Sequence, residues 1–558
     1  MGSQINASAA PFSSKNLGIE VARRSVTFHP SVWKDYFLSY TSTMTEISSH
    51  EERELQRLKE EVKKLLAVTP DDSIHKLDLI DAIQRLGIGY HFERETKESL
   101  QYMYDTYRES CYKQNEDLRT IALRFRLLRQ QGYYVPCDVF NKFKDQEGKF
   151  EESLVSNVRG LLSMYEAAQY GVHGEEILEE ALKFSTFHLE SMKNNSREIS
   201  AALEMPIHKS LTRVEMKKFL SIYQEDESHD DVLLKFSILD FNLLQKMHQN
   251  EISEITRWWK ALEFCEKLPF IRDRAVEGYF WILAVYFEPQ YSLARKILTK
   301  VIGMASVIDD IYDNYGTLDE LVLFTNAIES WNINAVDTLP SYMKYFYKSL
   351  LDVYVSIEEE LGKIGQTYRI HYAIKELKKL VWAYLEEAKW TYSGYVPTME
   401  EYMKVELVTA GYMMLCTTSL VGIQEHVPKE AFYWITSEPL LILASSVICR
   451  LMDDLVGQEF EQKITAVDCY MNEKGVSKEE TFAVLRKEIA NAWKDINQEC
   501  LSLTTIPMVI IERVINITRV MNLLYREEDA YTNSKTKLKS LVISVLIQPV
   551  TIESYFHL

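Results

Sequence analysis

The sequence VIGMASVIDDIYD, Val301 to Asp313, joins a mostly apolar run to three carboxylates. On a helix, Asp309 and Asp313 lie one turn apart on nearly the same face, and Asp310 lies about 100° around the axis. The end of an apolar helix disfavours acids, because the helix dipole is negative there and the carboxylates repel one another. A bound divalent cation removes this conflict, and oxygen ligands favour magnesium or calcium.

A second apolar run with the same ending lies 144 residues further on. Leu440 to Met452 is mostly apolar, and Asp453 and Asp454 follow it directly. Glu461 comes two helical turns after Asp453, with Gly457 halfway between them. Only a tertiary fold can bring the two clusters face to face. Two such faces predict a magnesium cluster with open positions for water and substrate phosphates.

The alternative for either acidic cluster alone is a solvated helix face or a helix cap. An EF-hand is excluded, because the residues after Asp309 lack the alternating ligands and the glycine at the sixth position. Two apolar helices that both end in an acidic pair shift the interpretation toward a metal site.

The composition favours long helices and a reducing compartment. The chain of 558 residues contains only 19 Gly and 13 Pro, and no sustained alternation of apolar and polar residues indicates a sheet. The net charge of −19, without basic blocks, argues against nucleic acid and anionic membrane surfaces. Seven scattered Cys without a Cys-x-x-Cys pair indicate reduced thiols, not disulfides or zinc.

The pattern along the chain predicts two helical regions. Residues 1–22 are expected to be disordered, and the absence of a secretory segment or of an apolar run near 18 residues makes the cytoplasm the expected location. The predicted helices of the first half are 49–66, 77–93, 120–130 and 137–144. The acidic run Gln224 to Asp231 predicts a boundary between a helical domain at 23–230, without a site of its own, and a metal-binding domain at 231–558.

Basic and aromatic residues could serve the predicted metal site. Arg272 and Arg274 stand at a helix entrance, where guanidinium groups and the helix N-terminus favour an anion, although surface salt bridges are the alternative. Arg450 lies within the second apolar run, where it needs a carboxylate partner. The aromatic residues of this half are core residues or line a pocket for a cation: Tyr279, Phe280, Trp281, Tyr412, Tyr525 and Tyr531. Thr409 to Tyr412 predicts a break in an apolar helix.

These residues resemble the motifs of plant class I terpene synthases. Asp309-Asp310-x-x-Asp313 matches the aspartate-rich motif of that family, and Asp453 to Glu461 matches its second metal motif. Arg272 and Arg274 match its Arg-x-Arg pair. The resemblance runs over nearly the whole chain and includes Phe28 to Trp33, Phe125 to Arg129, Glu387 to Trp390 and Asp529 to Thr532.

The resemblance implies an all-α fold, in which a class I terpenoid synthase bundle follows an α-barrel-like domain. It implies three Mg²⁺ ions, replaceable by Mn²⁺, at Asp309, Asp310, Asp313, Asp453, Asp454, Gly457 and Glu461. Arg272, Arg274 and Arg450 are implied to hold the diphosphate of an allylic substrate. The implied catalytic residues are Arg272, Trp281, Asp529 and Tyr531. Metal ions and Arg neutralise charge on the leaving group, and a dry pocket protects the carbocation from water.

Three positions depart from the family pattern. Gly457 replaces the usual Ser or Thr, so one hydroxyl ligand is missing, and we expect water to fill its place. The segment Gln462 to Asp468 is a few residues shorter than the usual loop after Glu461, a loop that helps to cap the site in the family. Ala530 replaces a common Gly, with a small expected effect.

The substrate is expected to be farnesyl diphosphate, because the overall pattern resembles cytosolic sesquiterpene synthases of the cadinene type. The product is then a sesquiterpene hydrocarbon or alcohol, and the enzyme a monomer. Arg23-Arg24 followed by Trp33 is instead typical of monoterpene synthases, which use geranyl diphosphate. A non-catalytic helical binding protein is another alternative. A chain-elongating prenyltransferase normally has a second Asp-Asp-x-x-Asp motif, which Asp453 to Gly457 does not supply.

Overall fold

The computed structural model describes residues 23, 28–41, 46–107, 116–424, 427–457, 463–503, 505–533, 535 and 537–551. In these ranges the secondary structure is helical, and the one extended pairing is an isolated bridge between Lys144 and Phe150. The predicted all-α class is therefore confirmed. The predicted disordered segment 1–22 lies outside the described residues.

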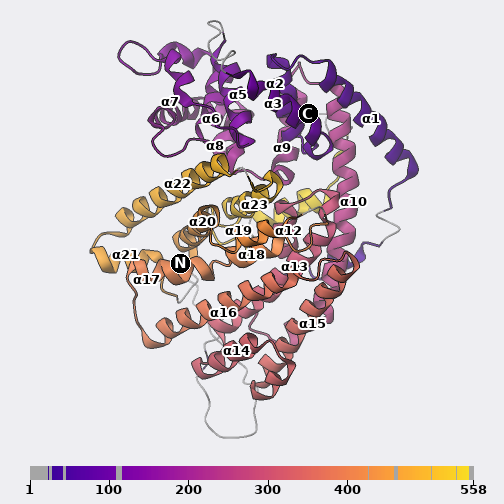
Figure 1. Ribbon diagram of the computed structural model, residues 1–558, viewed down its shortest axis with the longest axis vertical. Coiled ribbons are helices and arrows are strands. Elements are labelled where there is room, and N and C mark those ends of the chain that lie inside the picture. The colour runs from indigo at the N-terminus through magenta and orange to yellow at the C-terminus, as the bar shows by residue number, and fades with distance from the viewer. Residues whose placement is uncertain are drawn as a thin grey trace.

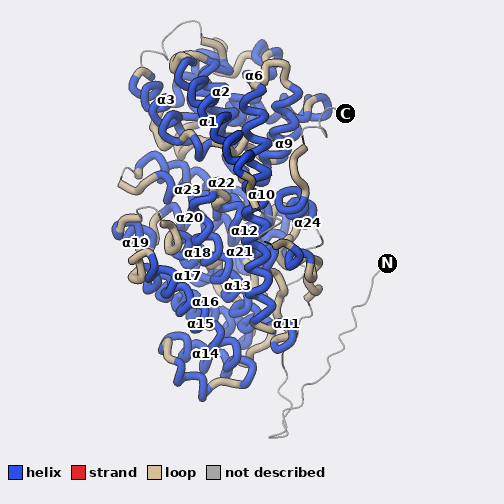
Figure 2. The backbone as a smooth tube through the Cα atoms, turned by 90° about the vertical axis from the view of Figure 1, so that its right-hand side faces the viewer, coloured by secondary structure: helices blue, strands red, loops and turns tan. Residues whose placement is uncertain are grey.

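The helices of the first half gather at one end of the molecule (Figures 1 and 2). They are α1 (Ser49–Val68), α2 (Ile74–Arg85), α3 (Glu93–Asp105), α5 (Leu118–Gln130), α6 (Val158–Ala168), α7 (Glu176–Met192), α8 (Arg197–Glu204) and α9 (Thr212–Glu225). Helix α1 begins where predicted because Ser48 and Glu51 form a reciprocal capping box at its N-terminus.

Two of the predicted helices differ from the structure. The segment 77–93 is not one helix: α2 ends at Arg85 and α3 begins at Glu93. Gly87 between them has a φ of 72°, a left-handed conformation that glycine adopts without steric cost and that ends the helix. The segment 137–144 forms a 3₁₀ helix, Cys137–Phe143, and not an α-helix.

The second half begins with α10, which runs from the first group of helices into the second (Figure 1). Its helices are α10 (Asp231–Ala261), α11 (Phe264–Lys267), α12 (Ala275–Val285), α13 (Ser292–Asn314), α14 (Leu318–Ser330), α15 (Ser341–Lys363), α16 (Arg369–Ser393), α17 (Met399–Thr409), α18 (Tyr412–Ser419), α19 (Lys429–Ile435), α20 (Leu440–Val456), α21 (Ala466–Lys474), α22 (Lys478–Ser502), α23 (Met508–Leu524) and α24 (Lys537–Val542). No described helix is long and apolar enough to cross a membrane.

Separate hydrophobic cores hold the two halves, and both ends of the chain cross between them. Trp33 and Phe37 belong to the large core of the second half. Val550 belongs instead to a core formed by α1, α2, α9 and the start of α10. The two halves are therefore tied together by packing at both termini as well as by α10.

The helices that carry the acidic clusters lie inside the second half. Helix α13 packs against α12, α16 and α18, and α20 packs against α18, α22 and α23. The predicted helix break is confirmed: α17 ends at Thr409 and α18 begins at Tyr412. Gly411 between them has a φ of 76°, which allows the chain to turn there.

Candidate active site

The first acidic cluster occupies the last two turns of α13. Asp310 is fully buried, and its carboxylate accepts a hydrogen bond of 2.7 Å from the backbone N–H of Arg272. The Nε of Arg272 lies 2.9 Å from the same carboxylate. Asp309 and Asp313 are also shielded, with side chains 22% and 15% exposed. Asp310 therefore anchors the loop before α12 through the backbone of Arg272.

The second acidic cluster shows the same division of roles at the end of α20. Asp454 accepts hydrogen bonds of 2.7 Å from the Tyr402 hydroxyl and 2.8 Å from the backbone N–H of Ala466. These bonds tie α20 to α17 and α21. Asp453 instead pairs with Nη2 of Arg450 at 2.9 Å. One acid of each pair thus accepts a backbone hydrogen bond in the protein interior, and its neighbour is held by an arginine side chain.

Three cations lie among these carboxylates. Arg272 forms an ion pair with Asp309. Nη1 of Arg450 lies 3.4 Å from Asp454 and 3.4 Å from Glu406 on α17. Lys463 forms an ion pair with Asp313, and its Nζ lies 3.1 Å from Oε1 of Glu387 on α16. Three residues after Lys463, the backbone N–H of Ala466 bonds to Asp454 at the end of α20, so the fold brings the two clusters together.

Burial and neighbouring charges shift the pKa values of the acids in different directions. Burial raises the pKa of Asp310 to about 6 and, together with Asp309 and Glu387, raises that of Asp313 well above its usual range. Burial would also raise the pKa of Asp309, but the charges of Lys463 and Arg272 outweigh it and lower that pKa. Burial and the charge of Glu387 raise the pKa of Glu406 to about 8. Packing several acids together is costly unless cations join them.

The donor atoms fit a hard divalent cation. Oε2 of Glu387 and Oε1 of Glu406 are buried without a hydrogen-bond partner among the described residues. Carboxylate oxygens of this kind are the ligands that magnesium takes in proteins. No three His, Cys, Asp or Glu side chains in the described ranges already converge as a metal centre, since Arg272, Arg450 and Lys463 stand between the acids. Glu461 lies outside the described residues.

Gly457 follows the last residue of α20, and its backbone N–H bonds to the carbonyl of Asp453. Because Gly457 has no side chain, only its backbone could supply a ligand atom. The predicted water in place of a hydroxyl stays a prediction.

Arg274 is held by backbone carbonyls. Its guanidinium donates to the carbonyls of His29 at 3.0 Å, Tyr531 at 3.0 Å and Thr532 at 2.7 Å. The side chain is only 2% exposed. Arg274 therefore ties the N-terminal stretch and the 531–532 segment to the start of α12, and in this structure it does not face the acids. Its predicted contact with a diphosphate stays a prediction.

Aromatic rings border the acids on the side of α12. The rings of Trp281 and Tyr531 lie edge to face, with centroids 5.9 Å apart. The guanidinium carbon of Arg272 lies 5.6 Å from the centroid of Tyr531. Asp529 accepts hydrogen bonds of 3.0 Å from the backbone N–H groups of Tyr531 and Thr532, so it shapes the turn that carries the ring.

Two known family models match this chain. The model described as "Terpene synthase, N-terminal domain" matches residues 32–211, and that described as "Terpene synthase family, metal binding domain" matches residues 260–495. The chain belongs to the terpene synthase family. The metal-binding domain spans both acidic clusters, from α13 to α20.

Relatives of this terpene synthase match over almost its whole length. A (-)-germacrene D synthase of Origanum vulgare is 57% identical, over 98% of each chain. An (E)-beta-caryophyllene synthase of the same species is 54% identical, over 98% of this chain and 99% of the relative.

Solved structures share the fold. A limonene synthase with 2-fluorolinalyl diphosphate has a TM-score of 0.89 and 32% identity, over 95% of this chain and 100% of that chain. An isoprene synthase from Populus x canescens, in complex with three Mg²⁺ ions and dimethylallyl-S-thiolodiphosphate, has a TM-score of 0.84 and 33% identity, over 90% and 98%. The synthase thus has the fold that the resemblance implied.

Four residues of the synthase's site have no role predicted from the sequence: Tyr402, Glu406, Glu387 and Lys463. Glu406 offered a signal, because it stands in a helix just before the break at Gly411. Lys463 offered another, because it comes two residues after Glu461. Nothing in the sequence pointed to the contact of Tyr402 with Asp454.

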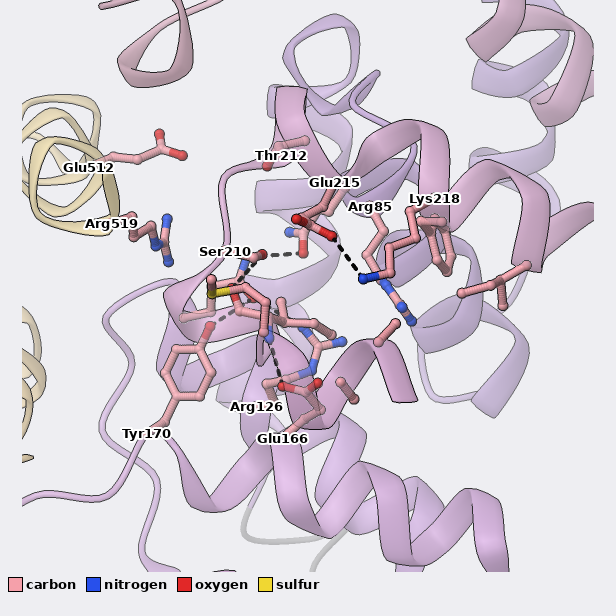
Figure 3. A pocket seen from close by; sticks show the side chains of 18 residues that line it. Arg85, Arg126, Glu166, Tyr170, Ser210, Thr212, Glu215, Lys218, Glu512 and Arg519 are labelled. Carbon is pink, nitrogen blue, oxygen red and sulfur yellow. Dashed lines mark hydrogen bonds and ion pairs between the residues drawn. The ribbon is translucent and has the colours of Figure 1, made fainter. Parts of the chain in front are cut away.

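A cavity of the synthase lies where helices of the first half meet α23. It has a volume of about 110 Å³ and is bordered by α2, α5, α6, α9 and α23 (Figure 3). Glu166 accepts a hydrogen bond of 2.9 Å from the backbone N–H of Ile207, and Arg126 pairs with Asp81. Neighbouring protein groups thus hold Glu166 and Arg126 in place.

Proposed function

We propose that this terpene synthase is a sesquiterpene synthase that ionises farnesyl diphosphate, cyclises the carbocation and releases diphosphate. The relatives named germacrene D and caryophyllene synthases support the C15 substrate, because they match over 98% of the chain. The product is a sesquiterpene hydrocarbon or alcohol.

The observation that carries this function is the excess of acid at the ends of α13 and α20. Three cations, Arg272, Arg450 and Lys463, share the site with seven carboxylates: Asp309, Asp310, Asp313, Glu387, Glu406, Asp453 and Asp454. A buried site with so many more carboxylates than cations is unfavourable on its own. It is suited to holding divalent cations that an anionic diphosphate accompanies.

Three Mg²⁺ ions are proposed, with Mn²⁺ as a substitute. Asp309 and Asp313 on one side, and Asp453 with Glu461 on the other, are the proposed ligands, with water beside Gly457. Asp310 and Asp454 were also predicted as ligands, and their hydrogen bonds give each an additional role in fixing the local backbone. When bound, the metal ions neutralise negative charge that develops on the leaving diphosphate.

The basic side chains complete the diphosphate site. The Arg272 and Arg450 guanidinium groups can each leave a carboxylate for the diphosphate oxygens, which they bind in bidentate fashion. Arg274 is proposed to act on the diphosphate too, and its bonds to the carbonyls of Tyr531 and Thr532 keep that segment near Arg272. These contacts favour the transition state in which the carbon–oxygen bond breaks.

The aromatic rings next to this site suit the carbocation. The faces of Trp281 and Tyr531 carry negative partial charge, which stabilises a cation without reacting with it. Both side chains are less than a tenth exposed, so bulk water is kept away. Asp529 holds Tyr531 in this place. Loss of a proton or capture of one water then ends the reaction.

We also propose that the chain is organised as two helical domains. The break between α9 and α10 supports domains at 23–230 and 231–558, with the site in the second. A monomer acting in the cytoplasm is proposed, and size-exclusion chromatography with light scattering tests the monomer.

Geranyl diphosphate is the second candidate substrate, because Arg23-Arg24 followed by Trp33 is typical of monoterpene synthases. Purified protein incubated with farnesyl, geranyl or geranylgeranyl diphosphate, with Mg²⁺ or with EDTA, separates the candidates by gas chromatography–mass spectrometry. A Mg²⁺-dependent C15 product supports the proposal. Product from geranyl diphosphate alone assigns a monoterpene synthase, and no product from any substrate favours a non-catalytic binding protein.

A further inference from the structure

Lys463 joins the two acidic faces of the site. Its ammonium group pairs with Asp313 on α13 and lies 3.1 Å from Glu387 on α16. Three residues further on, the backbone N–H of Ala466 bonds to Asp454 on α20. A short piece of chain, fixed at one acidic face by its backbone, thus reaches the other face with its side chain.

This ammonium group is largely removed from solvent. The side chain of Lys463 is 16% exposed, and those of Asp313 and Glu387 are 15% and 9% exposed. Two carboxylates in such surroundings need a cation between them. Oε2 of Glu387 is nevertheless left without a hydrogen-bond partner among the described residues, so one ammonium group does not satisfy the pair completely.

The connection around Lys463 restricts where the ammonium can go. Thr465 caps α21, its hydroxyl and backbone N–H both bonding to Asp468 at 2.7 Å and 2.9 Å. Lys463 lies only two residues before this cap. The cap and the bond of Ala466 to Asp454 hold the backbone near α20. The flexible side chain of Lys463 is therefore the part that can move when another cation arrives.

We propose that Lys463 is a tethered cation that holds Asp313 and Glu387 in the metal-free enzyme and competes with a divalent metal ion for them. It is a positioning residue of the proposed metal site, on which this inference rests. The ammonium keeps the two acids from repelling each other and keeps α13, α16 and α20 in register. Metal binding without substrate is consequently weakened, since each ion that binds Asp313 must displace a neighbouring positive charge.

A substitution that removes the positive charge of Lys463 abolishes its competition with the metal ion. Lys463→Met is expected to bind Mn²⁺ in the absence of substrate at least about tenfold more tightly than the wild type, because the competing charge is gone. Lys463→Arg keeps the charge and is expected to stay within about threefold of the wild type. The electron paramagnetic resonance signal of free Mn²⁺ measures the affinity of both variants.

The metal-free protein provides a second measurement. In EDTA, Lys463→Met is expected to melt at a lower temperature than the wild type, because Asp313 and Glu387 lose their cation. Added Mn²⁺ is expected to raise the melting temperature of this variant more than that of the wild type. Lys379→Met is a matched control, because Lys379 lies 3.1 Å from buried Glu376 on α16 and outside the site. It is expected to leave Mn²⁺ affinity unchanged.

Equal or weaker Mn²⁺ binding by Lys463→Met than by the wild type overturns the proposal. If the wild type binds no Mn²⁺ without substrate, the proposal still requires binding by Lys463→Met, and its absence there also overturns it. A gain in affinity that Lys379→Met shares would equally count against it. These titrations use Mn²⁺ alone, whereas the proposed sesquiterpene synthase activity fails by a separate result, the absence of product from the wild type.

Discussion

Tyr402 tests whether the fixed acid of the second pair matters to metal binding. Its hydroxyl donates a hydrogen bond of 2.7 Å to Oδ2 of Asp454, and both residues are buried. Tyr402→Phe removes only this hydroxyl and leaves the ring in place. A hydrogen bond to a charged group contributes about 1.5–3 kcal/mol to stability, so the variant should lose about that much free energy of unfolding.

The loss of this hydrogen bond should also weaken metal binding, because it loosens Asp454 at the proposed metal site. Without the hydroxyl, Asp454 keeps the N–H of Ala466 and the contact with Arg450, and its carboxylate is less firmly held. Removing a group that orients a ligand shell typically weakens metal affinity about 10- to 100-fold. Initial rates of product formation should therefore need about tenfold more Mg²⁺ for half-maximal activity, while kcat at saturating Mg²⁺ changes little.

The control for this prediction is Tyr395→Phe. Tyr395 also donates to a glutamate, Glu401, at 2.9 Å, but it is exposed and its partner does not reach the site. This variant should match the wild type in melting temperature and Mg²⁺ requirement. An unchanged Mg²⁺ requirement in Tyr402→Phe, or an equal change in both variants, would refute the role given to Asp454.

Three further predictions concern single residues. Asp309→Ala should abolish turnover, by at least about a hundredfold in kcat, while circular dichroism shows an unchanged helical fold; unchanged turnover would contradict the metal assignment. Gly457→Ser should retain activity, because a hydroxyl replaces the proposed water, and an inactive but folded variant would count against that water. Burial raises the pKa of Glu166 to about 7 from 4.5, so its charged form is disfavoured in the folded state and stability falls as pH rises between these values. Glu166→Gln should therefore raise the free energy of unfolding by about 3 kcal/mol at pH 8 and by much less at pH 5, in urea titrations; an equal gain at both pH values would contradict the assignment.

Local patterns in the sequence predicted the elements that carry the site. The apolar runs before Asp309 and Asp453 form α13 and α20, and the break at Gly411 lies where small residues indicated it. These features depend on residues within a few turns, which sequence displays directly. The single helix predicted for 77–93 was wrong because its apolar spacing continues through Gly87, whose positive φ ends α2.

The division of roles within each acidic pair could not be predicted from sequence. Asp309 and Asp310 are equivalent as neighbouring carboxylates, and only the position of the Arg272 backbone makes Asp310 the buried anchor. The carbonyl partners of Arg274 come from His29 and from residues 531–532, more than 200 positions away in each case. Tyr402 and Lys463 likewise reach the site only through tertiary packing.

The most direct test of the central claim is the release of diphosphate from farnesyl diphosphate by the wild-type protein as Mg²⁺ is titrated. We expect release that rises with Mg²⁺, stops in EDTA and is accompanied by an equal amount of sesquiterpene product. Release that continues at the same rate in EDTA, or no release at any Mg²⁺ concentration, would contradict a metal-dependent ionisation at the ends of α13 and α20.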